Sequence, residues 1–396
     1  MKFIPLLILA CLFTSCKTAS LAKNLKSGSY FSTEEVTEVV FYNQHNTLII
    51  PVKIGENTYQ FLFDTGAPNV ISPEVAAAIQ TQNSITQKVY DSSGKAEDLA
   101  FIEIPLIEIG GAEFRNTGAA IADFNKGNVL SCFNIDGIIG ANLMRLCHVQ
   151  IDYPSETIRF AKNYSALIME DGFSVPFTHE LQASPYINLK VGHKSIKKVL
   201  VDTGFTGFIN LDKSLKATTP IEEGVAKYRT IGTTTEGIFG LAAPDTSINY
   251  LMGDFSLDTV QIALLGTVIF QGTNKKLIGN EFLNNFVTTY NWSNKTIHFS
   301  PVMKAAVVPQ AYEIGFMKID DKLVVAWVKE GTTFQSHVVK PGTQVLIVDE
   351  LDTRECSHEN YCDVLEILKE KRPQIHVLVL LDGRELEIIL ERKDLF

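Results

Sequence analysis

The tripeptide Asp-Thr-Gly occurs twice in this chain of 396 residues, at positions 64–66 and 202–204. In both places an alternating, strand-like stretch precedes it. A hydrophobic-hydrophobic-glycine pattern follows it at nearly the same distance, at 138–140 and 277–279. Matched elements in the same order are the mark of an internal repeat. We therefore interpret the sequence as a diverged duplication in which each copy places one aspartate on a tight turn.

The duplication extends further along both copies. Residues 157–160 read Thr-Ile-Arg-Phe and residues 296–299 read Thr-Ile-His-Phe, at the same interval after their glycines. A lone Asp-Thr-Gly is weak evidence because Asp and Gly both favour β-turns, so a purely structural turn is the alternative. Two copies with matched neighbours on both sides are much harder to reach by chance.

These motifs resemble those of an aspartic protease of the retropepsin and pepsin clan, over residues 45 to 300. In that family a strand leads into Asp-Thr-Gly, and a later hydrophobic-hydrophobic-Gly strand crosses beneath it. Residues 61–67 and 199–205 fit the first element, and residues 136–140 and 276–279 fit the second. The short lobes look more like duplicated retropepsins than pepsin lobes. The resemblance predicts a mainly β protein with a bilobed fold of two related β lobes.

The resemblance also assigns roles to the repeated motif. It implies an aspartic endopeptidase, a peptide-bond hydrolase, whose catalytic residues are Asp64 and Asp202. The threonines would lock the two loops together across the lobe interface, and the glycines would let backbone amides approach the carboxylates. The four residues in these supporting roles are Thr65, Gly66, Thr203 and Gly204.

Two carboxylates held within about 3 Å cannot both stay ionised, so Asp64 and Asp202 would share one proton and titrate as a pair. Pepsin-like enzymes place Ser or Thr after the motif, where a hydroxyl stabilises the ionised carboxylate. Ala67 and Phe205 stand there in this chain. We therefore expect a less acidic pair, active at mildly acidic to neutral pH. The size of Phe205 leaves open that it narrows the cleft or abolishes activity.

Two tyrosines, Tyr90 and Tyr228, follow their aspartates by the same interval. Each precedes a turn-rich segment, at 91–94 and 230–234, where a retropepsin carries its flap hairpin. Loops over a rigid scaffold often carry function, which makes both tyrosines flap candidates. The alternative is that they are ordinary strand residues.

The N-terminus has the composition of a targeting segment. Lys2 is followed by an apolar run over residues 3–13, then by small residues and Cys16. This indicates a lipoprotein-type signal peptide over residues 1–16 with lipidation of Cys16, or an ordinary signal peptide with an incidental cysteine. The expected location is the bacterial cell envelope, lipid-anchored at the periplasmic face or cell surface. The polar stretch 17–38 is expected to be a tether.

A third unit, over residues 308–396, resembles a bacterial PDZ domain. Its order is a short strand pair, a helical stretch at 362–370 and a C-terminal hairpin with an Asp-Gly turn. The resemblance makes Ile314, Gly315 and Phe316 the loop that holds a peptide end, with the peptide added as a strand. Glu313 stands where a glycine is usual, and a structural domain that binds nothing is the alternative.

The cysteines leave the disulfide pattern open. Four of the six follow the signal segment, an even number that permits two disulfides in an exported protein. Cys356 and Cys362 are close in sequence, and Cys132 and Cys147 share the first lobe. Four buried free thiols are the alternative. The eight histidines are scattered without a ligand spacing, so we expect neither a metal nor a cofactor.

The net charge of -10 argues against nucleic acid as a partner. The expected domains are lobes at 39–165 and 166–305, followed by the PDZ-like unit. The expected function is peptide-bond hydrolysis by one chain that needs no dimer for catalysis. The PDZ-like unit would recruit peptide or protein substrates. Phe205 and Glu313 leave room for an alternative, a catalytically inactive peptide-binding envelope lipoprotein.

Overall fold

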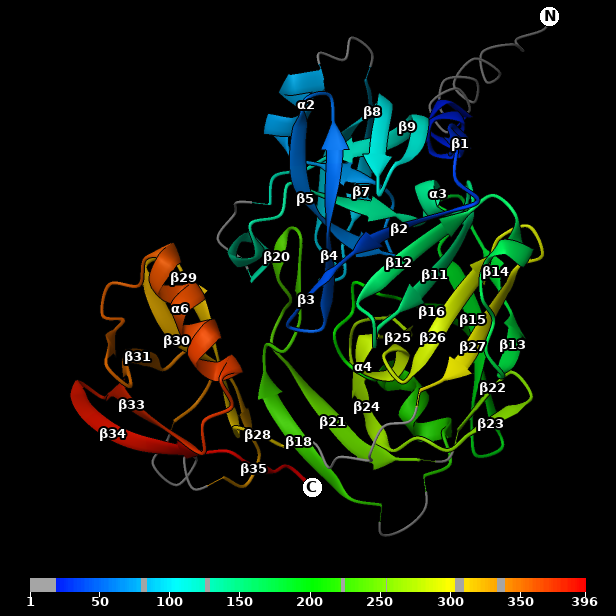
Figure 1. The fold of residues 1–396 in the computed structure, drawn as a ribbon. Coiled ribbons are helices and arrows are strands. Elements are labelled where there is room, and N and C mark those ends of the chain that lie inside the picture. The colour runs from blue at the N-terminus through cyan, green and yellow to red at the C-terminus, as the bar shows by residue number, and fades with distance from the viewer. Residues whose placement is uncertain are drawn as a thin grey trace, which may run out of the picture.

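The computed structural model describes residues 19–79, 84–124, 129–221, 225–253, 255–302, 310–332 and 339–396. The protein is mainly β, as predicted, with a few short helices at the margins of its sheets (Figure 1). The high strand content agrees with the mainly β fold that the resemblance predicts. Cys16 and the predicted signal peptide lie outside the described residues.

The first lobe, as we name it, is a sheet of nine strands within the described residues. Their order is β1-β9-β6-β10-β5-β4-β8-β7, with β3 paired to β4. The strands are β1 (Ser29–Phe31), β3 (Tyr42–Gln44), β4 (Thr47–Ile54), β5 (Asn57–Asp64), β6 (Val70–Ile71), β7 (Ile85–Tyr90), β8 (Ala96–Ile109), β9 (Ala112–Ile121) and β10 (Gly137–Gly140). Because β10 lies between β5 and β6, the Asp-Thr-Gly turn that joins those two strands passes over the end of β10.

Three short helices flank this sheet: α2 (Pro73–Ile79), the 3-10 helix η1 (Val129–Phe133) and α3 (Ala141–Met144). The start of α2 is the one the sequence predicts. Ser72 precedes Pro73, and its hydroxyl accepts a hydrogen bond of 3.2 Å from the backbone amide of Val75.

A second sheet joins the two lobes. In the part of the chain that the structure describes it has six strands, ordered β13-β27-β26-β11-β12-β2. They are β2 (Val36–Val40), β11 (His148–Asp152), β12 (Thr157–Ala161), β13 (Phe173–Pro176), β26 (Phe286–Asn291) and β27 (Thr296–Pro301). The repeated Thr-Ile-x-Phe segments are β12 and β27. Their partners β11 and β26 pair antiparallel at the centre, where Val149 lies opposite Tyr290.

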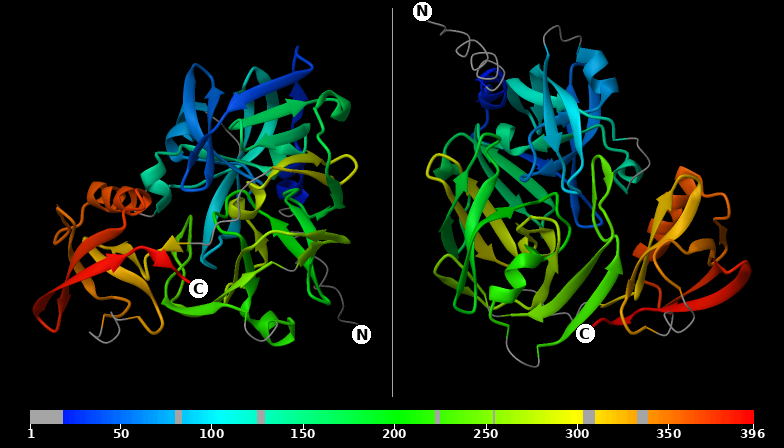
Figure 2. Two further views of the ribbon diagram at one scale, coloured as in Figure 1. Left: turned by 60° about the horizontal axis from the view of Figure 1, so that its bottom comes forward. Right: turned by 180° about the vertical axis from the view of Figure 1, so that it is seen from behind.

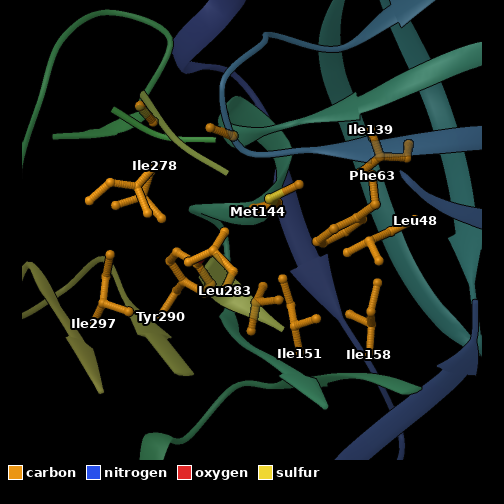
Figure 3. Close-up of a cluster of buried hydrophobic side chains, with 14 of the residues drawn as sticks. Leu48, Phe63, Ile139, Met144, Ile151, Ile158, Ile278, Leu283, Tyr290 and Ile297 are labelled. Atoms are coloured by element: carbon orange, nitrogen blue, oxygen red, sulfur yellow. The ribbon is translucent and has the colours of Figure 1, made fainter. Parts of the chain in front are cut away.

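One hydrophobic core continues from the first lobe through this sheet into the second lobe. Figure 3 shows Phe63 and Ile139 from one copy of the repeat and Ile278 from the other, above Ile151 and Tyr290 of the joining sheet. The two copies therefore bury their apolar faces together, which fixes the relative position of the loops they carry.

The second lobe repeats the first around its own Asp-Thr-Gly turn, with strand order β23-β22-β15-β16-β25-β17-β24-β21-β18. The strands are β14 (Thr178–His179), β15 (Pro185–Val191), β16 (Lys194–Val201), β17 (Ile209–Asp212), β18 (Lys227–Gly232), β21 (Asp245–Met252), β22 (Phe255–Leu257), β23 (Val260–Ile262), β24 (Gly266–Gln271) and β25 (Leu277–Ile278). A small hairpin, β19 (Glu236–Gly237) and β20 (Gly240–Leu241), projects between β18 and β21. Three more short helices are η2 (Tyr164–Ala166), η3 (Lys213–Thr218) and α4 (Asn280–Leu283).

The C-terminal domain has its own hydrophobic core. Its elements are β28 (Gln310–Ala311), β29 (Ile314–Ile319), β30 (Lys322–Lys329), β31 (Gln344–Val348), β32 (Leu351–Asp352), α6 (His358–Lys369), β33 (Gln374–Leu381), β34 (Arg384–Glu391) and β35 (Lys393–Asp394). The predicted Asp-Gly hairpin is β33–β34, where Asp382 and Gly383 both have positive φ angles of 48° and 76°. The predicted helical stretch is α6, which begins earlier, after the capping Ser357.

The C-terminal domain is joined to both lobes. Strand β30 pairs with β18, so its sheet continues that of the second lobe. A disulfide between Cys132 of η1 and Cys362 of α6 links it to the first lobe. Both pairings suggested by sequence proximity are thus wrong, and Cys147 and Cys356 are buried free thiols. Folding brings together two cysteines that lie 230 residues apart.

The expected tether at 17–38 is also corrected. From residue 19 this stretch is helical over 19–26, and it then forms β1 and β2. Leu25 is buried, and the Asn24 side-chain amide donates a hydrogen bond of 2.8 Å to the Ile102 carbonyl. A tether is expected because the segment is mostly polar, but its few apolar residues anchor it to the first lobe. Among the residues described, every helix is too short or too polar to span a bilayer.

Candidate active site

The two predicted catalytic aspartates occupy equivalent positions. Asp64 ends β5 and lies opposite Gly140 on the parallel strand β10. Asp202 directly follows β16, and its backbone amide donates a hydrogen bond of 2.9 Å to the carbonyl of Ile278 on β25. The hydrophobic-hydrophobic-Gly segments therefore are the crossing strands that the sequence predicts, and each holds the strand that carries an aspartate.

The two loops are tied together by their threonines. The backbone amide of Thr65 donates to the hydroxyl of Thr203 at 2.9 Å, and the amide of Thr203 donates to the hydroxyl of Thr65 at 3.0 Å. Each hydroxyl in turn donates to a carbonyl of the other lobe, that of Val201 at 2.7 Å and that of Phe63 at 2.8 Å. Both threonines are fully buried, so four reciprocal hydrogen bonds fix the loops without competition from water.

The glycines of the motif make room for the carboxylates. A Cβ on Gly66 would lie 2.5 Å from a carboxylate oxygen of Asp202, and one on Gly204 would lie 2.4 Å from a carboxylate oxygen of Asp64. Their amides also donate within each motif, Gly66 to Asp64 at 2.7 Å and Gly204 to Asp202 at 2.9 Å. Each side chain thus points across the lobe interface at the partner's glycine.

Asp64 and Asp202 form an acidic pair. Each carboxylate reaches the glycine of the other motif, and part of each residue stays accessible to solvent. Burial raises the pKa of Asp64 and, together with the nearby Asp64 charge, raises the pKa of Asp202 well above its usual range. A carboxyl pair in this environment retains one proton at a pH where separate aspartates are ionised.

The glycines of the crossing strands are required by close approach. A Cβ on Gly140 would lie 2.2 Å from the backbone of Pro68, and one on Gly279 would lie 2.4 Å from the carbonyl of Phe205. The backbone is less able to move than a flexible side chain, so any larger residue would displace the Asp-Thr-Gly loop. This is the physical reason for the glycine at the end of each repeated pattern.

The residues after the motif offer no hydroxyl to the pair. The side chains of Ala67 and Phe205 carry no hydrogen-bonding group. The Phe205 ring lies against Gly207 and Gly279, where a Cβ would come within 2.6 and 2.5 Å of it. The ring thus packs on the backbone of its own lobe.

The two flap candidates have different surroundings. Tyr90 ends β7 beside the turn to β8, with 67% of its surface exposed. Tyr228 lies on β18 with its ring centroid 4.9 Å from that of Phe396 and 5.6 Å from the amine of Lys329. Tyr228 therefore packs at the contact with the C-terminal domain. The two tyrosines have equal spacing from their aspartates but different surroundings.

Sequence reasoning missed a contact between the two lobes at these turns. The carboxylate of Asp91, in the turn between β7 and β8, accepts a hydrogen bond of 2.8 Å from the backbone amide of Phe239 in the β19–β20 hairpin. An aspartate at the start of a turn and an apolar pair between Gly237 and Gly240 were the available signals. Neither indicates that the two turns meet.

The predicted peptide-binding residues lie in β29. Ile314, Gly315 and Phe316 are buried, and a register shift against β30 falls between Gly315 and Phe316. Glu313 is buried as well, and its carboxylate forms ion pairs with Lys329 at 3.1 Å and Lys393 at 3.0 Å. Two lysines therefore compensate the charge that stands in place of the usual glycine.

One group of potential metal ligands is found among the described residues: Cys132, His358 and Cys362. The two sulfurs are bonded to each other, and a disulfide sulfur is not the thiolate that binds metal. The imidazole of His358 lies 3.5 Å from the sulfur of Cys362. The two cysteines of this group therefore form the covalent link between the first lobe and the C-terminal domain.

A family model described as aspartyl protease matches residues 50–143. The match includes the first Asp-Thr-Gly and the first hydrophobic-hydrophobic-Gly, which are the elements that build the Asp64 side of the site. It supports an aspartic protease and does not extend over the second lobe or the C-terminal domain. No curated protein matches the chain.

Proposed function

We propose that the chain is an aspartic endopeptidase in which Asp64 and Asp202 together activate a water molecule for peptide-bond hydrolysis. The observation that carries this proposal is the reciprocal threonine arrangement, which holds each carboxylate against the glycine of the other motif. A pair of structural turns would need neither four buried cross-lobe hydrogen bonds nor two carboxylates that reach across the interface. The aspartyl protease match adds independent support.

The mechanism follows from one shared proton. The ionised carboxylate accepts a proton from water as the water oxygen attacks the scissile carbonyl carbon. The protonated carboxyl donates its proton to the carbonyl oxygen, which gives a neutral tetrahedral diol. When the C–N bond breaks, one carboxyl protonates the leaving nitrogen and the other accepts a diol proton. The pair is restored with one proton and one charge. Rigid loops hold both carboxyl groups in place, and small displacements would cost much of the rate.

For the C-terminal domain we propose the PDZ-type function that the resemblance implies. Within the described residues β29 pairs with β30 alone, and α6 packs on the same hydrophobic cluster as Ile314 and Phe316. An extended peptide added beside β29 would gain main-chain hydrogen bonds, with side chains directed at α6. The domain would thereby recruit peptide or protein substrates to the cleft.

The proposal includes export and a lipid anchor on Cys16, which would hold the enzyme at the envelope membrane. Its test is a Cys16→Ser substitution followed by fractionation and metabolic lipid labelling. The variant should lose both label and membrane association. Labelling that persists in the variant would contradict an anchor on Cys16.

The enzyme proposal is tested by cleavage of a peptide library, from about pH 4 to pH 8, with wild-type protein and with Asp64→Asn and Asp202→Asn variants. Cleavage by the wild type that disappears in both variants supports the pair. A folded wild type that binds peptides without cleaving them would favour the peptide-binding envelope lipoprotein instead. Cleavage retained in either variant would mean that the pair is not the catalyst.

A further inference from the structure

The β19–β20 hairpin leaves the second lobe and contacts the first. In Figures 1 and 2 it rises from the second lobe and stands between the first lobe and the C-terminal domain. Its base is held within the second lobe, where the hydroxyl of Thr234 donates to the side chain of Gln271 at 3.0 Å. Its tip carries Ile238 and Phe239. We call this hairpin, residues 236–241, the arm, because its base is held by hydrogen bonds and its tip is apolar.

Three hydrogen bonds attach the tip to the first lobe. The amide of Phe239 donates to the carboxylate of Asp91 at 2.8 Å. The amide of Val129 donates to the carboxylate of Glu236 at 3.0 Å, and the hydroxyl of Ser92 donates to the carbonyl of Glu236 at 3.4 Å. The arm is therefore fastened on two sides, to the β7–β8 turn and to η1.

The carboxylate of Asp91 forms hydrogen bonds both within its own turn and with the β19–β20 hairpin. One of its carboxylate oxygens accepts hydrogen bonds from the amides of Ser93 and Lys95 and shapes its own turn, while the other accepts from Phe239. Asp91 is only 8% exposed. A Cβ on Gly237 would lie 2.1 Å from the second oxygen, so the arm approaches too closely for any side chain there.

The Phe239 ring is buried in an apolar cluster of the first lobe. It is 8% exposed, and the cluster also contains Leu62 and Ile138, with Ala67 packed against the cluster. Leu62 lies two residues before Asp64, and Ile138 is its register partner on β10. The neighbours of these residues along the strands enter the main core, so Leu62 and Ile138 face the opposite side of the sheet.

We propose that Phe239 is a specificity-determining residue that limits the size of the substrate side chain accepted beside Asp64. The inference rests on the proposed protease function. A substrate bound between the carboxyl pair and the two turns would direct a side chain at Leu62 and Ile138. Phe239 belongs to the same cluster, and Asp91 fixes it by accepting a hydrogen bond from its backbone amide, so its ring would occupy part of that space. Small side chains fit beside that ring, and aromatic ones collide with it.

The test compares peptides that differ only in Ala, Val or Phe at one position flanking the scissile bond. The readout is the ratio of kcat/KM for Phe over Ala peptides, taken at each flanking position. Phe239→Ala should raise this ratio at least about tenfold at one position, because pocket volume decides discrimination of this kind. Phe239→Leu should give an intermediate value, and it serves if the alanine variant folds poorly.

Three further variants separate the effect of the arm's position from general destabilisation. Gly237→Ala should displace the Asp91 carboxylate, loosen the arm and shift the ratio in the same direction. Gly253→Ala is its control, since the nearest atom to that Cβ would be 3.5 Å away. Phe31→Ala, on β1 with 50% exposure, is the control for loss of a phenylalanine. Both controls should keep the wild-type ratio.

An unchanged ratio in Phe239→Ala would overturn the inference while leaving the protease proposal intact, provided the wild type cleaves. A KM that falls equally for all three side chains would also overturn it, because that pattern marks an arm that blocks every substrate alike. Absence of cleavage in the wild type, with no effect of Asp64→Asn, would instead refute the proposed function and this inference with it.

Discussion

The hydroxyls of Thr65 and Thr203 each accept a hydrogen bond from the other's backbone amide, across the interface between the two lobes. Each threonine thus satisfies a buried donor of the other copy, and neither loop has complete hydrogen bonding alone. The position of one aspartate is therefore set by the lobe that carries the other. This relationship makes two related halves behave as one site.

Replacing Thr65 by valine should destabilise the protein by about 1–3 kcal/mol, because the buried amide of Thr203 loses its acceptor at nearly constant side-chain volume. Cleavage should fall with it, since the Asp64 loop is no longer fixed. Thr65→Ser is the matched control and keeps the hydroxyl. Urea unfolding measures the stability of both variants, and a peptide-cleavage assay measures their activity. Equal stability of the valine and serine variants would contradict the argument.

The carboxyl pair should make stability depend on pH. The raised pKa values mean that the folded state keeps a proton that unfolded aspartate releases at about pH 4. This contribution is fully present below that pH and is lost as the pH rises towards the folded pKa values. Wild type should therefore lose more stability than Asp202→Asn between about pH 4 and pH 7. Thermal unfolding across that range would show it, and parallel curves would refute it.

Supplying a hydroxyl after the first motif should shift the activity profile. Ala67→Ser would donate a hydrogen bond to the Asp64 carboxylate and favour its ionised form. The pH optimum of cleavage should then move to lower pH than that of the wild type. Ala77→Ser, on the exposed side of α2, is the control. The measurement is kcat/KM against pH, and an unmoved acidic limb would count against a role for position 67.

Loss of the disulfide between Cys132 and Cys362 should lower the melting temperature. Native disulfides of this kind contribute about 2–5 kcal/mol. Cys132→Ser, Cys362→Ser and the double variant should be destabilised equally, because each removes the same bond. A reductant should lower the melting temperature of the wild type and leave the double variant unchanged. Additive effects of the two single variants would show that the bond is absent.

The elements that the sequence predicts well are those set by local chemistry. The cap of α2 needs only Ser72 and Pro73, and the β33–β34 turn needs only Asp382 and Gly383. The Asp-Thr-Gly turns are equally recognisable because a buried loop against a crossing strand tolerates few residues. Repetition of the pattern then identifies both aspartates without any knowledge of the contact between them.

The features that the sequence does not predict depend on distant chain segments. Four cysteines allow three connectivities, and nothing near Cys132 indicates that Cys362 lies beside it. Likewise the Asp91 turn and the Phe239 hairpin each resemble an ordinary surface turn. Their meeting follows from how the two lobes are oriented, which the joining sheet determines. The equal spacing of Tyr90 and Tyr228 from their aspartates likewise does not indicate that Tyr228 packs against Phe396.

Strand β18 has β21 on one side and β30 of the C-terminal domain on the other, with Ile231 opposite Val328. A chain truncated after residue 302 would therefore leave β18 as an open edge, with unpaired backbone groups and the side chain of Ile231 uncovered. Such edges recruit other strands, so the isolated lobes should self-associate. The C-terminal domain thus covers a strand edge that would otherwise promote aggregation, and its removal would lower the solubility of the two lobes.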